Sequence, residues 1–142
     1  MDDRYYMEEA FKEAKKAYRI NEIPVGAVIV NNKSGKIVSR GYNKKEKDNL
    51  CFSHAEVNAI IKACKKEKNW RLNDHTLYVT LKPCKMCIEI IKNSYIDKIV
   101  YCCEPIDDQN KKIEIFKYDN PIMEEKSKNI IKNKFVEIRD NK

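Results

Sequence analysis

Glycine, proline and long apolar runs are scarce in this chain. The 142 residues include only three Gly and four Pro, too few for a linker-rich or low-complexity protein. The longest apolar stretch, from Pro24 to Val30, is far shorter than the roughly 20 residues of a membrane-spanning helix. Residues 1–4 are charged rather than apolar, so no export segment is indicated and we expect a cytoplasmic protein without a membrane partner.

Charge and cysteine content narrow the class of protein further. Lys and Arg number 29 against 22 acidic residues, giving a net charge of +7. This excess indicates either an anionic partner such as RNA or the codon bias of an A+T-rich genome. Six Cys without an export segment favour metal binding or burial over a disulfide framework. The length fits one domain over residues 1–142.

Hydrophobic periodicity predicts alternating strands and helices. The turn at 31–35 joins two strands into an antiparallel hairpin, and the later β-α-β order favours parallel pairing, so we expect a mixed sheet with helices on its faces. Residues 43–50 are predicted to be a loop. We expect helices at 4–18, 53–66, 83–93 (opened by Pro83) and 122–131, and strands at 25–30, 36–42, 76–81, 98–103, 113–118 and 135–138.

The most informative motif is His54-Ala55-Glu56, followed downstream by Pro83-Cys84-Lys85-Met86-Cys87. The order His-x-Glu and then Pro-Cys-x-x-Cys is typical of zinc-dependent deaminases. Zinc prefers four tetrahedral ligands of nitrogen and sulfur type. Cys84 and Cys87, three residues apart at a helix start, present both sulfurs from one face, and the positive end of the helix dipole favours their thiolate forms.

Three protein ligands, His54, Cys84 and Cys87, leave the fourth zinc position to water, as in catalytic sites. Glu56 is then the predicted proton shuttle, which takes a proton from the water and delivers protons to the ring nitrogen and the departing amine. Other interpretations exist for each part. Ser53-x-x-Glu56 fits a helix capping box, and Cys-x-x-Cys also occurs in structural zinc sites and redox pairs. A non-catalytic zinc module would normally supply a fourth protein ligand.

The remaining residues with chemical potential are given structural interpretations. His75 is expected in a loop before a strand. Trp70 and Arg71 are expected to anchor a loop, or else to stack on nucleic acid. The other cysteines are predicted to be small apolar fillers: Cys51, Cys64, Cys102 and Cys103.

Several stretches resemble the cytidine-deaminase-like superfamily, and within it the bacterial tRNA adenosine deaminases. The resemblance covers roughly residues 5–103. Beyond the zinc motif, it rests on Glu22-Ile23-Pro24-Val25-Gly26-Ala27-Val28, Gly41-Tyr42-Asn43, Asn69-Trp70-Arg71-Leu72 and Thr76-Leu77-Tyr78-Val79-Thr80-Leu81.

This resemblance implies a three-layer α/β/α fold around a five-stranded mixed sheet, and a homodimer whose interface helps to shape the active site. It implies conversion of adenosine to inosine at the wobble position of a tRNA, so that the anticodon stem-loop is the expected partner. By residue match, Asn43 contacts the target nucleotide, Val25 lines the base pocket and Ala55 also binds substrate.

Three departures from the family pattern leave a second substrate class open. Lys82 stands where the family usually has Glu. The segment 102–108 replaces the usual Gly-Ala and RNA-holding Asp, with Asp107 as a substitute in a different register. No closing helix with aromatic residues is predicted after residue 131. The alternative is therefore a deaminase of a free base or nucleotide, such as guanine, cytosine or deoxycytidylate.

Overall fold

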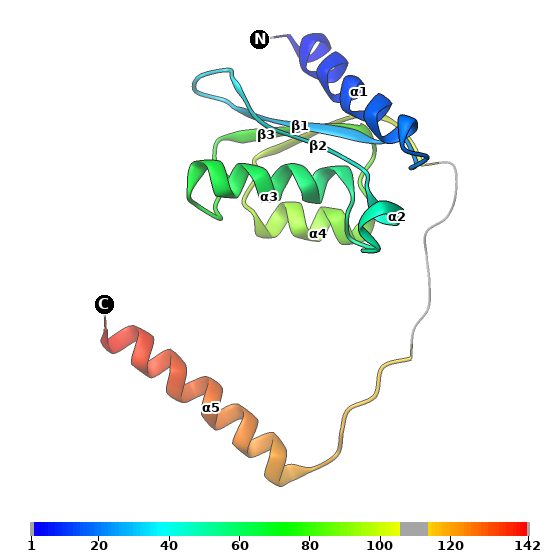
Figure 1. The fold of residues 1–142 in the computed structure, drawn as a ribbon. Helices are drawn as coiled ribbons and strands as arrows, with labels where there is room; N and C mark the ends of the chain where they lie inside the picture. The colour runs from blue at the N-terminus through cyan, green and yellow to red at the C-terminus, as the bar shows by residue number, and fades with distance from the viewer. Residues whose placement is uncertain (1, 106–113, 142) are drawn as a thin grey trace. The chain divides into compact units, whose positions relative to one another are not determined.

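The computed structural model describes residues 2–105 and 114–141 (Figure 1). The chain folds into two compact units, Met1–Gln109 and Asn110–Lys142. Among the residues described, the first unit contains the sheet and four helices, and the second contains one helix. The expectation of a single domain over 1–142 stays a prediction.

The first unit is built on a mixed sheet of strand order β2-β1-β3-β4. β1 pairs antiparallel with both β2 and β3, whereas β3 and β4 are parallel. The predicted hairpin and the parallel β-α-β unit are thus confirmed. The described residues form four strands where the resemblance implied five, and a fifth strand stays a prediction. The strands are β1 (Gly26–Asn31), β2 (Ile37–Tyr42), β3 (His75–Leu81) and β4 (Lys98–Cys103).

Helices cover both faces of this sheet, which gives the predicted three-layer α/β/α arrangement (Figure 1). α1 (Asp3–Arg19) packs on one face, whereas α3 (Ala55–Glu67) and α4 (Lys85–Asn93) pack on the other. Alternate strand residues face opposite layers because side chains of a strand have a period of two. Val28, Val30 and Tyr78 meet α1, and the second core on the opposite face contains Ala27, Ile29, Leu77 and Val79.

Two glycines allow helices to approach the sheet closely. A Cβ added at Gly26 would overlap backbone atoms of α1, namely Ala10 O and Ala14 N. A Cβ added at Gly41 would overlap Ala55 O and Ala59 N of α3. Gly41 therefore sets how deeply the first turns of α3 lie against β2, and this places the residues at the helix start.

An ion-pair cluster fastens α1 to β2. Arg40 of β2 donates from Nη2 to Glu9 Oε1 at 2.8 Å, and its Nη1 lies 3.7 Å from Glu13 Oε2. Both carboxylates are buried. Hydrogen bonds from Lys12 and then from Arg40 lower the pKa of Glu9 below its ordinary value, so the buried carboxyl stays ionised and paired.

Three local predictions need correction within the first unit. The expected loop at 43–50 contains a short helix, α2 (Lys45–Asp48). Pro83 does not occupy the first helical position, because Cys84 is the N-cap and α4 begins at Lys85. His75 is not a loop residue but the buried first residue of β3.

The structure of the second unit differs in part from the elements predicted for it. α5 runs over Pro121–Asp140, so the predicted helix at 122–131 is confirmed, whereas the strand at 135–138 and the missing closing helix are wrong. Asn120 caps the helix by accepting from Met123 N at 3.1 Å, and Pro121 suits the first turn. Residues 114–118 form no strand. None of the described helices is long and apolar enough to cross a membrane.

Candidate metal centre and active site

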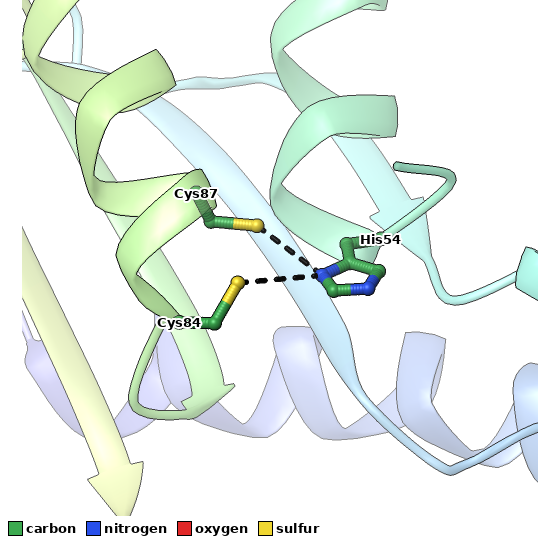
Figure 2. A group of neighbouring side chains, drawn as sticks. All are labelled: His54, Cys84 and Cys87. Carbon is green, nitrogen blue, oxygen red and sulfur yellow. Dashed lines mark hydrogen bonds between the residues drawn. The ribbon is translucent and has the colours of Figure 1, made fainter. Parts of the chain in front are cut away.

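Three potential metal ligands meet where α3 and α4 begin (Figure 2). His54 Nδ1 lies 3.3 Å from Cys87 Sγ and 3.9 Å from Cys84 Sγ. All three donor atoms lie within 4.8 Å of one another. Cys87 is buried, whereas His54 and Cys84 are half-buried, so the cluster is reachable from solvent on one side.

The helix starts place these side chains without using them as caps. His54 is the N-cap of α3 and Cys84 is the N-cap of α4, both with extended backbone and neither with a side-chain cap hydrogen bond. Cys87 lies one turn into α4 and so projects from the same end as Cys84. Two partially positive helix N-termini therefore face one cluster of nitrogen and sulfur donors, which favours thiolates.

The spacing of the donors fits a tetrahedral zinc ion. Zinc–sulfur bonds of about 2.3 Å and zinc–nitrogen bonds of about 2.05 Å place a nitrogen and a sulfur ligand about 3.6 Å apart. The observed separations of 3.3 and 3.9 Å lie on either side of that value. Within the described part of the chain, the cluster holds three protein ligands. A fourth position is thereby left for water, as in catalytic rather than structural zinc sites.

Electrostatics also favour a cation at this point. Burial, with a contribution from Lys45, lowers the pKa of His54, so its imidazole is kept in the neutral form that binds metals. Burial and the neighbouring Glu56 and Cys84 raise the pKa of Cys87 when no cation is present. A zinc ion among these groups would offset the free-energy cost of ionising the buried Cys87 thiol, and it would hold both sulfurs as thiolates.

Glu56 lies beside the cluster in the first turn of α3. Its side chain is 4% exposed, and burial raises the pKa of its carboxyl above the ordinary value. The carboxyl also interacts with the Cys87 side chain, so it lies next to the metal ligands. A carboxyl group with a raised pKa holds a proton more readily than an exposed glutamate does, which suits a group that both accepts and donates protons.

The capping box considered for Ser53 and Glu56 is not formed. Ser53 Oγ donates to Asp48 Oδ2 at 2.7 Å and accepts from Asn58 Nδ2 at 3.1 Å. Asn58 Nδ2 also donates to Tyr42 O at 2.9 Å. These bonds anchor the start of α3 to the end of β2 and to α2, and they leave the carboxyl of Glu56 available for chemistry. Asp48 and Asn58 were not singled out from the sequence.

The three predicted substrate-binding residues lie around the same helix start. Asn43 is buried, and its backbone N donates to Val25 O at 3.1 Å. Val25 is partly buried and packs against the core below α3. Ala55, next to His54, is fully buried at the first position of α3. Val25 and Ala55 thus pack in the same core as Cys84 and Cys87, and Asn43 is hydrogen-bonded to Val25, whereas the contacts of these residues with a substrate stay a prediction.

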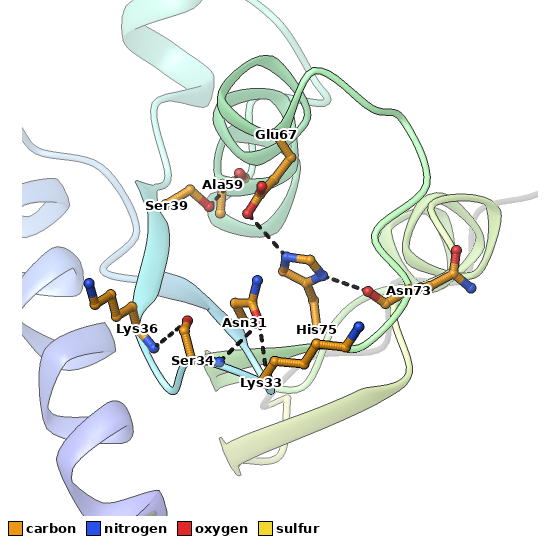
Figure 3. Close-up of polar contacts among 9 residues, drawn as sticks. All are labelled: Asn31, Lys33, Ser34, Lys36, Ser39, Ala59, Glu67, Asn73 and His75. Atoms are coloured by element: carbon orange, nitrogen blue, oxygen red, sulfur yellow. Dashed lines mark hydrogen bonds and ion pairs between the residues drawn. The ribbon is translucent and has the colours of Figure 1, made fainter.

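His75 lies outside the metal cluster and supports the far end of α3 (Figure 3). Its Nδ1 is 2.8 Å from Asn73 O, and its Nε2 is 3.4 Å from Oε1 of Glu67, the last residue of α3. Ser39 Oγ donates to Ala59 O in the middle of the same helix at 2.8 Å. These contacts hold α3 against the sheet along its length, which fixes the direction in which its first turn points.

The other singled-out residues are not part of the cluster. Trp70 and Arg71 stack on each other at the surface, with the Arg71 Cζ 4.3 Å from the ring centroid, and Tyr95 lies beside Trp70. All six cysteines are free. Four of them were predicted to be small apolar fillers of the core. That prediction is wrong for three of the four, because Cys51, Cys102 and Cys103 are exposed. Asp107 lies outside the described residues.

Comparison with characterised proteins places the cluster in a known context. Residues 1–103 match the family described as the cytidine and deoxycytidylate deaminase zinc-binding region. A tRNA-specific adenosine deaminase of Bacillus subtilis is 46% identical over 99 residues, which cover 70% of this chain and 60% of that protein. A tRNA-specific adenosine deaminase of Rickettsia bellii is 44% identical over 95 residues, covering 67% and 66%. The chain thus spans about 60% of the length of the first of these relatives.

Solved structures of similar fold include two substrate classes. A structure from a study of tRNA:A34 deaminases that edit the wobble position has a TM-score of 0.66 at 37% identity, covering 69% of this chain and 74% of that chain. The guanine deaminase of Bacillus subtilis has a TM-score of 0.69 at 33% identity, covering 73% and 66%. The fold, the zinc-fitting cluster and the match over residues 1–103 agree, and the chain belongs to the cytidine and deoxycytidylate deaminase zinc-binding family.

Proposed function

We propose that this chain is a zinc-dependent hydrolase that converts adenosine to inosine at the wobble position of a tRNA anticodon. The observation that carries the proposal is the buried carboxyl of Glu56 beside a three-ligand cluster of His54, Cys84 and Cys87. The similarity to tRNA-specific adenosine deaminases at 44% and 46% identity supports the choice of substrate.

Each protein group has a defined task in this reaction. His54, Cys84 and Cys87 would hold the ion, and zinc in such a site supplies a Lewis acid that lowers the pKa of water at its fourth position. Glu56 accepts a proton from the attacking water and passes it to the ring nitrogen. It then accepts the second proton of the water, from the hydroxyl now bonded to the ring carbon, and transfers it to the departing amine as the carbon–nitrogen bond breaks. Adenosine and water become inosine and ammonia, and Glu56 ends in its starting ionisation state.

Residues around the cluster supply the other elements of recognition. Asn43, Val25 and Ala55 are proposed to form the wall against which the target base lies. Three exposed or half-exposed lysines lie on α2 or at its N-cap, directly after Asn43, and suit contacts with RNA phosphates: Lys44, Lys45 and Lys47. An anticodon loop already splays its bases, so little unstacking is needed to bring the amine to the metal.

A free base or nucleotide is the second candidate substrate. The similarity in fold and sequence to a guanine deaminase, at a TM-score of 0.69 and 33% identity, is the observation that favours it. The chemistry assigned to Glu56 and the metal ligands is the same in both cases. The two candidate substrates therefore differ in the molecule that binds beside Asn43, and the amine is removed in the same way from both.

The test is an assay of zinc-loaded protein on both substrate classes. Unmodified tRNA-Arg with A34 is incubated with the protein and position 34 is analysed for inosine, and ammonia release is measured with guanine, cytosine and deoxycytidylate. We expect inosine in the tRNA, with binding that weakens steeply as salt rises. Ammonia from a small molecule, with the tRNA untouched, would replace the RNA substrate by the second candidate.

A homodimer and a cytoplasmic location are part of the same proposal. Exposed apolar side chains lie close in sequence to the metal ligands, namely Leu50, Phe52 and Met86. A second subunit that covers them would shape the entrance to the site. Sedimentation velocity of the zinc-loaded chain tests this point, since a monomer at micromolar concentration would contradict it.

A further inference from the structure

Glu22 is a buried acid that has no part in the chemistry described above. It lies between α1 and β1, and only 6% of its surface is exposed. Its Oε1 accepts from Glu46 N at 3.0 Å and its Oε2 accepts from Lys47 N at 2.8 Å. Both oxygens of one carboxylate thus bind backbone amides of a segment 24 and 25 residues further along the chain.

These amides belong to the first turn of α2, where a helix has N–H groups without partners in the helix. The N-cap residue, Lys44, makes no side-chain cap hydrogen bond. Asn43 Oδ1 accepts from Lys45 N at 3.1 Å, and Glu22 accepts from the next two amides. Asn43 and Glu22 together therefore take the place of an N-cap side chain, and the Glu22 carboxylate lies at the positive end of the helix.

The same two segments are joined again at the predicted substrate wall. Asn43 N donates to Val25 O at 3.1 Å, and Asn43 Nδ2 donates to Ile23 O at 3.1 Å. These two bonds orient the Asn43 amide group and attach it to the chain just after Glu22. The position of Asn43 therefore depends on two attachments, one through Ile23 and Val25 and the other through α2 and Glu22.

We propose that Glu22 is a positioning residue that fixes α2, and through it Asn43 and Val25, for binding of the substrate base. The proposal rests on the proposed function in one respect, that Asn43 and Val25 contact the substrate. The hydrogen bonds that the Glu22 carboxylate accepts come from α2 and not from the metal ligands or Glu56. Loss of Glu22 therefore leaves the proton transfers unchanged and weakens substrate binding.

The variant that tests this is Glu22→Gln, which keeps the shape but removes the charge and one acceptor oxygen. The matched control is Glu9→Gln, a buried acid on α1 that pairs with Arg40 and Lys12 instead. Three quantities are measured for each zinc-loaded variant: zinc content, hydrogen exchange of the Glu46 and Lys47 amides, and separate values of kcat and KM. The exchange measurement needs no substrate.

We expect Glu22→Gln to keep one zinc per chain and to exchange the Glu46 and Lys47 amides about tenfold faster, because charge-assisted hydrogen bonds are lost. KM should rise about tenfold or more with kcat within about twofold, because misplaced binding residues reduce kcat/KM strongly. Glu9→Gln should change neither the exchange of those two amides nor KM. Unchanged exchange in Glu22→Gln, or a fall in kcat with KM unchanged, would overturn the proposal.

The outcome for Glu22 is separable from the outcome for the proposed function. If the wild-type protein deaminates a free base and not tRNA, the RNA substrate is refuted, and KM for that base is the value compared between the variants. Faster exchange with an increased KM for the base still supports the positioning role. Faster exchange with an unchanged KM would refute it, because α2 would then be fixed by Glu22 without consequence for binding.

Discussion

Glu56 and the three metal ligands divide the chemistry among single residues. His54, Cys84 and Cys87 supply nitrogen and sulfur at separations that suit zinc, and in the proposed reaction Glu56 is the one of these four residues that changes its protonation state. Burial raises the pKa of Glu56 above its ordinary value, which suits the proposed role of accepting and then donating a proton.

The first prediction at this scale concerns Glu56→Gln. The amide has nearly the same shape, so we expect one zinc per chain and an unchanged melting temperature. Deamination should fall about 10²- to 10⁴-fold, because Gln cannot accept the proton of the attacking water. Zinc is measured by elemental analysis and turnover by ammonia release. Glu89→Gln, at an exposed position on α4, is the control and should behave as wild type. Near-normal turnover in the zinc-loaded Glu56 variant would refute the role.

Sequence reasoning found the residues that belong to a compact motif and missed those that act over long separations. The motif is visible in the sequence because His54 and Glu56 are two residues apart at one helix start, and Cys84 and Cys87 are three residues apart at another. Glu22 stood out only as part of a stretch that resembles the family, and nothing local indicated its contacts, because its partners are 24 and 25 residues away and are backbone amides of any residue type. Only the folded chain shows that this carboxylate is buried and used.

At the scale of elements, the site is the meeting point of two helix starts held by a sheet. α3 supplies His54 and Glu56, and α4 supplies Cys84 and Cys87. The metal therefore joins two elements whose other contacts run through the sheet below them. Gly41 matters here because it lets α3 lie against β2 at the turn that follows His54.

The second prediction is that Gly41→Ala weakens both folding and zinc binding. The new Cβ would overlap Ala55 O and Ala59 N, so α3 must shift and carry His54 with it. We expect the free energy of unfolding to fall by about 1–3 kcal/mol. Zinc affinity, measured by competition with a chelator, should fall at least about tenfold, since a misplaced ligand costs metal affinity on this scale. Denaturant titration reports the stability.

Gly26→Ala is the matched control, because its Cβ would overlap α1 on the other face of the sheet. It should lower stability by a similar amount and leave zinc affinity within about twofold of wild type. Equal loss of zinc affinity in the two variants would show that general destabilisation, and not the placement of α3, controls the metal centre.

The strands and long helices of the first unit were predicted correctly, whereas the strand predicted at 135–138 in the tail was wrong. The strands at 26–31 and 75–81 and the helix at 55–67 were found within one or two residues. Residues 135–138 are apolar apart from Glu137, and so short an apolar run occurs equally in a strand or on one side of a helix. The helix start signal was nonetheless present, since Asn120 and Pro121 occupy the N-cap and first helical positions.

At the scale of the whole molecule, the two units carry different information about function. The unit Met1–Gln109 contains the metal cluster, the proposed substrate wall and the match to the family over residues 1–103. The unit Asn110–Lys142 contributes α5, which has no buried residue. The residues proposed to carry the chemistry therefore all lie in the first unit.

The most direct test of the account is the coordination of zinc in the purified chain, measured by X-ray absorption at the zinc edge. We predict one zinc per chain with two sulfur ligands at about 2.3 Å and two nitrogen or oxygen ligands at about 2.0–2.1 Å, one from His54 and one from water. Cys87→Ala should remove one sulfur ligand or the metal altogether. A site with four protein ligands, or zinc that is retained unchanged in Cys87→Ala, would contradict a catalytic centre at His54, Cys84 and Cys87.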